Sequence, residues 1–200
     1  VDARKDTGVT LRIERLLDRA RANGIRAVPL TASDYPRRLK DIPDPPSVLW
    51  VKGRLEPEEP RVAIVGTRRA SLYGRKACAD LSRDLAVQGV AVVSGLAQGI
   101  DTSAHEAVVK CGGRTVAVLG SGVELALKSS SARLVEGILR TSGALVSEYE
   151  PGVQAQPHHF PARNRLISGL SDGVVVVEAP RKSGALITAH MALEQNREVF

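Results

Sequence analysis

Short apolar runs alternate with amphipathic segments over the part of the chain that follows residue 60. The apolar runs contain almost only Val, Ile, Leu and Ala, which is typical of strands buried on both faces of a parallel sheet. We expect strands at Val62–Val65, Val90–Val93, Thr115–Leu119, Ala144–Val146 and Val174–Val177. We expect helices at Gly74–Gln88, Asp101–Cys111, Ala132–Leu139, Arg163–Leu170 and Gly184–Gln195. This alternation predicts an α/β fold with a doubly wound, mostly parallel sheet.

The first 60 residues follow a different pattern. Residues 10–23 have the spacing of an amphipathic helix, and short strands are expected at 25–30 and 48–51. Six prolines interrupt residues 31–60, so we interpret this stretch as a connector without a core of its own. We therefore divide the chain into an N-terminal helix with a proline-rich connector, 1–60, and a sheet domain, 61–200. Since the chain starts at Val1 and stops at Phe200, where another strand would begin, we expect both parts to be truncated.

Composition narrows the class of protein. The 200 residues are 43% apolar, which is enough for one good core. The sequence has neither an apolar run of about eighteen residues nor a basic and apolar leader, so we expect no membrane span and a cytoplasmic location. Cys78 and Cys111 lack CxxC spacing and lie in apolar helical patterns, which predicts two reduced thiols in the core. The net charge of +6 favours an anionic partner.

The expected carboxyl ends of the strands are rich in glycine and hydroxyl residues. Ligands of open α/β sheets bind at this edge, where glycine lets them approach the backbone and helix N-termini attract anions. Arg68 directly follows the first of these strands and could clamp a phosphate with two hydrogen bonds. The pattern predicts a site for a phosphate-bearing ligand, although single glycines also serve tight turns. The strand ends are Gly66-Thr67-Arg68, Ser94-Gly95, Gly120-Ser121-Gly122, Ser147-Glu148 and Glu178-Ala179.

Two further segments carry candidate binding groups. Phe160 stands between His159 and Pro161, and Arg163 and Arg165 follow it closely. Such an aromatic ring can stack on a base while the arginines reach the flanking phosphates, but the pattern is equally typical of a helix start whose phenylalanine packs in the core. Lys182, the Ser183 hydroxyl and the backbone N–H of Gly184 form a candidate anion-binding helix start.

The glycine patterns of common nucleotide sites are missing from the sequence. Gly66 opens no G-x-G-x-x-G segment, and Leu125 stands where a third glycine would follow Gly120 and Gly122. No acidic residue for a ribose follows the second strand of the sheet domain, and no P-loop occurs. We therefore expect no nicotinamide cofactor.

Catalytic and metal-binding patterns are also weak. Asp101 and His105 have a spacing that metal ligands can use, but two ligands rarely make a site, and N-capping of a helix is the simpler role for Asp101. His158 and His159 are expected to be surface residues. Because no nucleophile is paired with a base, we expect no enzymatic activity.

The motifs also occur in an order that resembles a known family. They are similar to the DNA-processing protein A family, also called DprA or Smf, from about residue 25 to Phe200. The resemblance implies an extended Rossmann-like domain that binds single-stranded DNA, protects incoming DNA and helps to load the RecA recombinase during natural transformation. It implies a homodimer, no catalysis and no cofactor. The matching segments are Tyr35-Pro-x-x-Leu39, Gly66-Thr-Arg68, Ser94-Gly-Leu-Ala-Gln-Gly-Ile-Asp101, Phe160-Pro-x-Arg-Asn-Arg-x-Ile-Ser-Gly-Leu170 and Ser183-Gly-x-Leu-x-Thr188.

The motif match implies a DNA pocket and leaves two alternatives open. The stretch 127–131 departs from the family pattern, which puts any ligand contact there in doubt. One alternative is an enzyme like the nucleoside-monophosphate phosphoribohydrolases, although Met191 stands where their catalytic glutamate would be. The other is a sensor that binds a small nucleotide. The implied DNA-binding residues are Gly66, Thr67, Arg68, Ser94, Gly95, Phe160, Arg163, Asn164, Arg165, Lys182, Ser183, Gly184 and Thr188.

Overall fold

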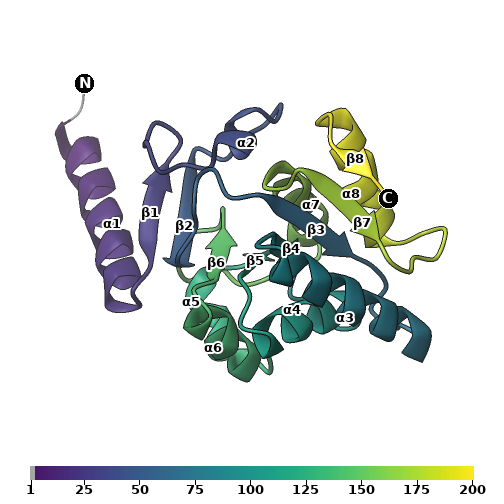
Figure 1. The fold of residues 1–200 in the computed structure, drawn as a ribbon. Coiled ribbons are helices and arrows are strands. Elements are labelled where there is room, and N and C mark those ends of the chain that lie inside the picture. Colours follow the sequence, from purple (N-terminus) through teal and green to yellow (C-terminus); the bar gives the residue numbers. More distant parts are fainter. Residues whose placement is uncertain (1–2) are drawn as a thin grey trace.

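A single sheet of eight strands forms the centre of the molecule (Figure 1). The computed structural model describes residues 3–200, with the surroundings of side chains from Thr10 onward. The strand order is β1-β2-β6-β5-β4-β3-β7-β8. The strands are β1 Arg26–Pro29, β2 Val48–Gly53, β3 Arg61–Val65, β4 Ala91–Ser94, β5 Thr115–Leu119, β6 Ala144–Ser147, β7 Gly173–Val176 and β8 Glu198–Val199.

The six adjacent strands β6, β5, β4, β3, β7 and β8 run parallel to one another. β4, β5 and β6 are buried along their whole length, which explains why their sequences show no polar alternation. The chain adds β4, β5 and β6 on one side of β3 and then crosses to add β7 and β8 on the other. The predicted doubly wound, mostly parallel α/β sheet is therefore confirmed, and its topological switch point lies between β3 and β7.

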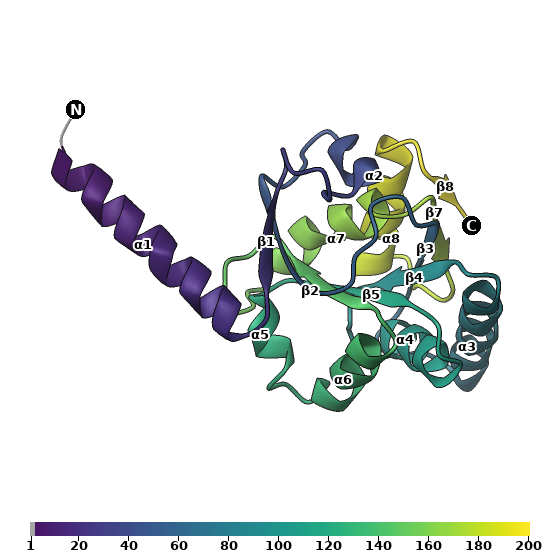
Figure 2. The same cartoon turned by 60° about the vertical axis from the view of Figure 1, so that its left-hand side comes forward.

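Helices cover both faces of this sheet (Figures 1 and 2). α3, α4 and α6 pack side by side on one face, and α7 and α8 pack together on the other. α7 begins four residues before the predicted start, so the whole FPARNR segment is helical. The helices are α1 Ala3–Ala22, α2 Arg37–Lys40, α3 Leu72–Val87, α4 Ile100–Lys110, α5 Val123–Ala126, α6 Ala132–Arg140, α7 His159–Gly169 and α8 Gly184–Glu194.

The N-terminal segment extends the sheet beyond β6. β1 and β2 pair antiparallel with each other, and β2 pairs antiparallel with β6. Tyr35, Leu39 and Leu49 from the proline-rich stretch are buried in the core that also contains β3 and β5 side chains. The Tyr35 hydroxyl donates a hydrogen bond to the Pro46 carbonyl at 2.8 Å. α1 projects away from the rest of the molecule (Figure 2). The domain boundary at residue 60 stays a prediction, and residues 1–2 of the first domain lie outside the described part.

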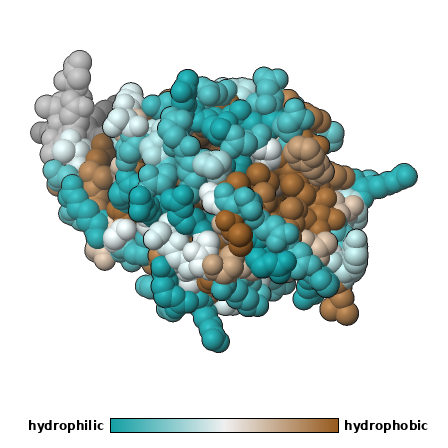
Figure 3. Space-filling model, in the orientation of Figure 1, coloured by the Kyte–Doolittle hydropathy of each residue, from teal (hydrophilic) through white to brown (hydrophobic). Residues whose placement is uncertain are grey.

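A broad apolar area lies amid polar residues on the right-hand side of the face drawn in Figure 3. Large apolar side chains that are exposed include Leu193 on α8 and Phe200 after β8. Within residues 3–200, no helix is both long and apolar enough to span a membrane.

The two cysteines differ in their surroundings. Cys78 is fully buried on α3, as predicted, but Cys111 is exposed at the end of α4, so the prediction of a second core thiol is wrong. The apolar pattern of α4 ends before Cys111, where the helix also ends.

Candidate nucleic-acid interface

An open pocket of about 580 Å³ lies at the carboxyl edge of the sheet, beside the switch point. The segments after β3 and β4 and the first turns of α7 and α8 form its walls. Of the predicted site residues, Ser94, Gly95, Arg165 and Lys182 do not line this pocket. The lining residues are Val65, Gly66, Thr67, Arg68, Ala97, Asp101, Pro157, Phe160, Pro161, Arg163, Asn164, Ile167, Ser183, Gly184, Ala185 and Thr188.

Phe160 carries two arginines close to its ring. The guanidinium carbon of Arg68 lies 5.6 Å from the ring centre, and that of Arg163 lies 5.9 Å from it. Both distances are within the range of cation–π attraction. Phe160 is partly exposed and Arg68 is exposed, so this ring and this cation are accessible to a ligand. A stacking surface beside a free cation is what a nucleotide base with its phosphate requires.

Arg163 is buried at the pocket, where its side chain donates hydrogen bonds to backbone carbonyl groups. Its Nη1 donates to the Gly95 carbonyl at 2.9 Å and also to the Val118 carbonyl, which ties α7 to the ends of β4 and β5. Burial lowers the pKa of Arg163, and the charge of Asp101 opposes that shift. A Cβ at Gly95 would lie 2.8 Å from Nη2 of Arg163, so glycine leaves the space that the guanidinium fills. The sequence pairs Arg163 with Arg165, but their surroundings are different.

Asp101 holds the loop between β4 and α4. Its carboxylate accepts hydrogen bonds from Gly95 N at 3.2 Å and Ala97 N at 3.3 Å. Burial raises its pKa, while the positive charge of Arg163 opposes this change. The predicted N-cap role is wrong, because Gly99 is the N-cap of α4 and Asp101 bonds to residues that precede the helix.

His105 lies one turn further along α4 than Asp101, and its side chain contacts a different segment of the chain. Its Nδ1 is 2.7 Å from the Thr115 hydroxyl on β5, and the ring is fully buried. Burial lowers its pKa to about 3, so the imidazole is neutral at physiological pH. Asp101 and His105 therefore form hydrogen bonds with separate segments of the chain, Asp101 with the loop after β4 and His105 with β5.

The start of α8 forms another wall of the pocket. Ser183 is its N-cap, and the Ser183 hydroxyl accepts a hydrogen bond from Leu186 N at 3.4 Å. Asn164 Nδ2 donates to the Gly184 carbonyl at 3.1 Å and so fixes α8 against α7. A Cβ at Gly184 would meet nothing within 4 Å, so the backbone is open to a ligand there. Helix starts attract anions because their first N–H groups lack partners within the helix. Lys182 is exposed next to this wall but does not line the pocket.

Ser94 and Glu178 lie at strand ends but do not line the pocket. The buried Ser94 hydroxyl donates to the Ile64 carbonyl at 2.6 Å and links β4 to β3. The Glu178 carboxylate accepts from the backbone N–H and the hydroxyl of Ser71, at 3.1 and 2.9 Å, at the start of α3. These two strand-end residues therefore bind other parts of the protein.

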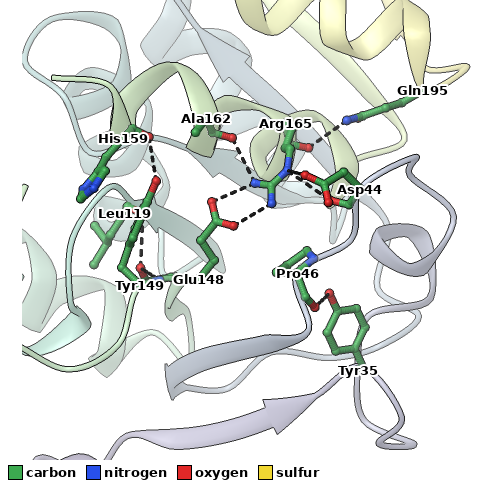
Figure 4. A network of polar contacts seen from close by, with 11 residues as sticks. Tyr35, Asp44, Pro46, Leu119, Glu148, Tyr149, His159, Ala162, Arg165 and Gln195 are labelled. Atoms are coloured by element: carbon green, nitrogen blue, oxygen red, sulfur yellow. Dashed lines mark hydrogen bonds and ion pairs between the residues drawn. The ribbon is translucent and has the colours of Figure 1, made fainter. Parts of the chain in front are cut away.

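Arg165 lies outside the pocket and joins three segments of the chain (Figure 4). Its Nη1 and Nη2 donate to the two carboxylate oxygens of Glu148 at 2.8 and 2.6 Å. Its Nε is 3.2 Å from Oδ2 of Asp44, and Gln195 donates to its carbonyl at 3.1 Å. The Arg165 side chain is thus fully engaged in joining α7 to the end of β6 and to the proline-rich stretch.

The two adjacent histidines also differ. His158 is exposed, as predicted, but His159 is buried, so the prediction of a surface residue is wrong for His159. Its ring stacks on Tyr149 with 4.0 Å between ring centres (Figure 4). Its Nδ1 lies 3.0 Å from the Gly120 carbonyl. Pro157 and Pro161, which flank this first turn, line the pocket and were not among the predicted site residues. Their position within three residues of Phe160 is the sequence signal that could have found them.

Comparison with known proteins gives the family. A sequence model of the family described as DNA recombination-mediator protein A matches residues 26–200. The chain belongs to this family. The resemblance predicted from the motifs is therefore confirmed. The DNA processing protein DprA of Bacillus subtilis is 42% identical over 191 residues, which are 94% of this chain and 64% of that protein.

Solved structures of family members share the fold. The X-ray structure of DNA processing protein A from Streptococcus pneumoniae has a TM-score of 0.80 at 40% identity, covering 88% of this chain and 62% of that one. The structure of the Helicobacter pylori protein, described for its unique single-stranded DNA binding mode, has a TM-score of 0.78 at 29% identity, covering 88% and 79%. The chain spans less than two thirds of the Bacillus subtilis and Streptococcus pneumoniae family members.

Proposed function

We propose that this member of the DNA recombination-mediator protein A family binds single-stranded DNA in the pocket at the switch point. The observation that carries the proposal is the partly exposed Phe160 ring with the exposed Arg68 guanidinium 5.6 Å from its centre. A base stacks on such a ring, and its phosphate pairs with such a cation. The open backbone at Gly184 offers a second contact for a phosphate. The Helicobacter pylori relative, described as a single-stranded DNA binder, supports this proposal.

The same contacts favour binding that tolerates any sequence. Every base has a flat face that can stack on Phe160, and every nucleotide has a phosphate for Arg68 and the α8 start. We therefore propose a protein that coats and protects single strands and passes them to a recombinase of the RecA type, which needs access to any sequence. Such a task belongs in the cytoplasm.

We propose binding without catalysis. Among the described residues that line the pocket, Asp101 is the only carboxylate, and it already accepts two backbone hydrogen bonds. Met191, at the position of the glutamate in phosphoribohydrolases, lines a different hollow beside Arg165 and Glu148. The alternative of a phosphoribohydrolase is therefore not favoured.

We further propose that the protein forms a homodimer. Leu193 on α8 exposes 60% of its surface, and Figure 3 shows a broad apolar area on the right-hand side of the molecule. Contiguous apolar areas on a protein surface are typical of contact sites. Light scattering should give twice the mass of the chain, and Leu193→Asp should reduce that mass. A monomer at all concentrations would contradict the proposal.

A titration tests the DNA-binding proposal. Fluorescence anisotropy of a labelled single strand should show affinity that rises with strand length and falls with salt, by a logarithmic slope of about 0.7 for each phosphate contact. Duplex DNA should compete poorly. Equal competition by a mononucleotide and an oligonucleotide would instead indicate a small-nucleotide sensor, and release of free base would indicate an enzyme.

A further inference from the structure

A second and larger hollow adjoins the pocket. This groove has a volume of about 830 Å³ and runs between α3 and α4 on one face of the sheet. Arg68 lines both the groove and the pocket, so its side chain borders both hollows. The groove is lined by Arg68, Arg75, Lys76, Ala79, Arg83, Gln98, Gly99, Thr102, Ser103, Glu106, Ala107, Lys110 and Cys111.

The charge of the groove is strongly positive. Five arginine and lysine residues line it, and Glu106 is the only carboxylate among its described lining residues. Lys76 and Arg83 are paired with Asp80 on α3, at 2.8 and 3.1 Å. Their charges are therefore partly compensated.

Two cations of the groove are free of such pairing. Within residues 10–200, neither Arg75 nor Lys110 forms an ion pair with a carboxylate. Arg75 uses only its Nε, which donates to the Ala70 carbonyl at 3.2 Å. Thus Arg68, Arg75 and Lys110 are available cations among the residues that line the groove, and Arg68 also lines the pocket.

We propose that a single strand held in the pocket continues past Arg68 into the α3/α4 groove, where Arg75 and Lys110 contact its phosphates. This inference rests on the proposed function, because it needs a strand anchored at Phe160. No aromatic residue is among the described residues that line the groove, so bases do not stack there. The groove would therefore add affinity that depends on salt and on strand length but not on base identity.

The chain contains a reporter for this path. Cys111 is exposed and lines the groove, whereas Cys78 is fully buried. Burial raises the pKa of the Cys78 thiol to about 11, so its reactive thiolate is scarce at neutral pH. Alkylation of the folded protein by a maleimide should therefore occur at Cys111.

The experiment compares a strand of about five nucleotides with one of about fifteen, a range that spans the site sizes of known single-strand binders. Alkylation of Cys111 is followed by mass spectrometry with each strand bound at saturation. Anisotropy at several salt concentrations then compares the native protein with the double variant Arg75→Gln and Lys110→Gln. Arg37→Gln is the matched control, because Arg37 is exposed on α2 and lines neither hollow.

We expect the long strand to slow alkylation of Cys111 and the short strand to leave it unchanged. The double variant should lower the salt slope for the long strand by about 1.4, which is two contacts of about 0.7 each, and leave the short strand unaffected. Binding of both strands without protection of Cys111 and with an unchanged slope would overturn this inference and leave the proposed function intact. Failure of both strands to bind would overturn the proposed function and this inference together.

Discussion

The guanidinium carbon of Arg68 lies 5.6 Å from the centre of the Phe160 ring, although one residue follows β3 and the other begins α7. They meet because the chain reverses its direction of strand addition between β3 and β7. The loop after β3 and the α7 start then border the same opening. The fold thus brings a cation and an aromatic ring from distant segments to one pocket.

Substitution of Arg68 should weaken DNA binding through charge. Arg68→Ala is expected to cost about 1.5–3 kcal/mol of binding free energy and to reduce the salt slope by about 0.7. Arg69→Ala is the matched control, because Arg69 is an exposed neighbour that does not line the pocket. Anisotropy titrations at several salt concentrations measure both variants. Equal losses for the two variants would point to general surface charge in place of a specific contact.

Substitution of Phe160 should weaken binding without a charge effect. Phe160→Ala is expected to cost about 1–3 kcal/mol per stacked base, with an unchanged salt slope. Phe200→Ala is the control, since Phe200 is the other phenylalanine of the chain and lies outside the pocket. The free energy of unfolding, measured in urea, shows whether each variant stays folded. A folded Phe160→Ala protein with native affinity would exclude stacking on this ring.

Substitution of Gly184 by alanine should weaken DNA binding without lowering the free energy of unfolding. The added Cβ has open space, so Gly184→Ala should leave the free energy of unfolding unchanged or raise it by up to about 1 kcal/mol. The methyl group would keep a phosphate away from the backbone N–H groups of the α8 start, at a cost of about 1.5–3 kcal/mol in binding. Urea unfolding and anisotropy give the two quantities. Native affinity in this variant would mean that no phosphate approaches this helix start.

Arg165 is expected to act on stability. Its two hydrogen bonds to Glu148 are partly buried, so Arg165→Ala should lower the free energy of unfolding by about 1.5–3 kcal/mol. Glu148→Gln should destabilise the protein in the same direction, because it removes the charge that Arg165 faces. The salt slope for DNA should stay the same in both variants. A stable Arg165→Ala protein with a reduced slope would show instead that Arg165 contacts DNA, as the motif match implies.

His105 should make stability depend on pH in the acid range. The pKa of His105 is about 3 in the folded protein, against an ordinary value of 6.5. At pH values between 3 and 6.5, the unfolded chain therefore binds the proton more strongly than the folded protein does. Stability contributed by the neutral ring is present above pH 6.5 and is lost as the pH falls toward 3, by up to about 1.4 kcal/mol per pH unit. His105→Gln should flatten this dependence in urea unfolding at several pH values. An unchanged dependence would show that other groups cause it.

The sheet could be predicted because its central strands are buried on both faces, and such burial leaves a continuous apolar run in the sequence. β4, β5 and β6 are buried throughout, and their sequences are correspondingly apolar. Once the strands are known, the rule for ligands at their carboxyl ends predicts a site near Gly66, and the helix-start pattern separately predicts an anion contact at Gly184. Local pattern and topology therefore sufficed for the fold, whereas binding of DNA at these residues stays a prediction.

The direction of individual side chains could not be predicted in the same way. Arg163 and Arg165 are two residues apart on α7, and a helix turns about 200° over that distance. One therefore points beneath the pocket and the other toward Glu148 and Asp44. Ser94, Gly95 and His159 likewise depend on partners from other segments of the chain, which no local pattern reveals.

Photocrosslinking would locate the bound strand most directly. A single strand that carries 5-iodouracil is irradiated on the protein, and mass spectrometry identifies the crosslinked residue. Because a base stacks on Phe160 in the proposed complex, the crosslink should map to Phe160 and disappear in Arg68→Ala at a strand concentration that saturates only the native protein. A crosslink confined to Tyr73, which is 82% exposed on α3, or to Trp50 in the sheet would contradict binding in this pocket.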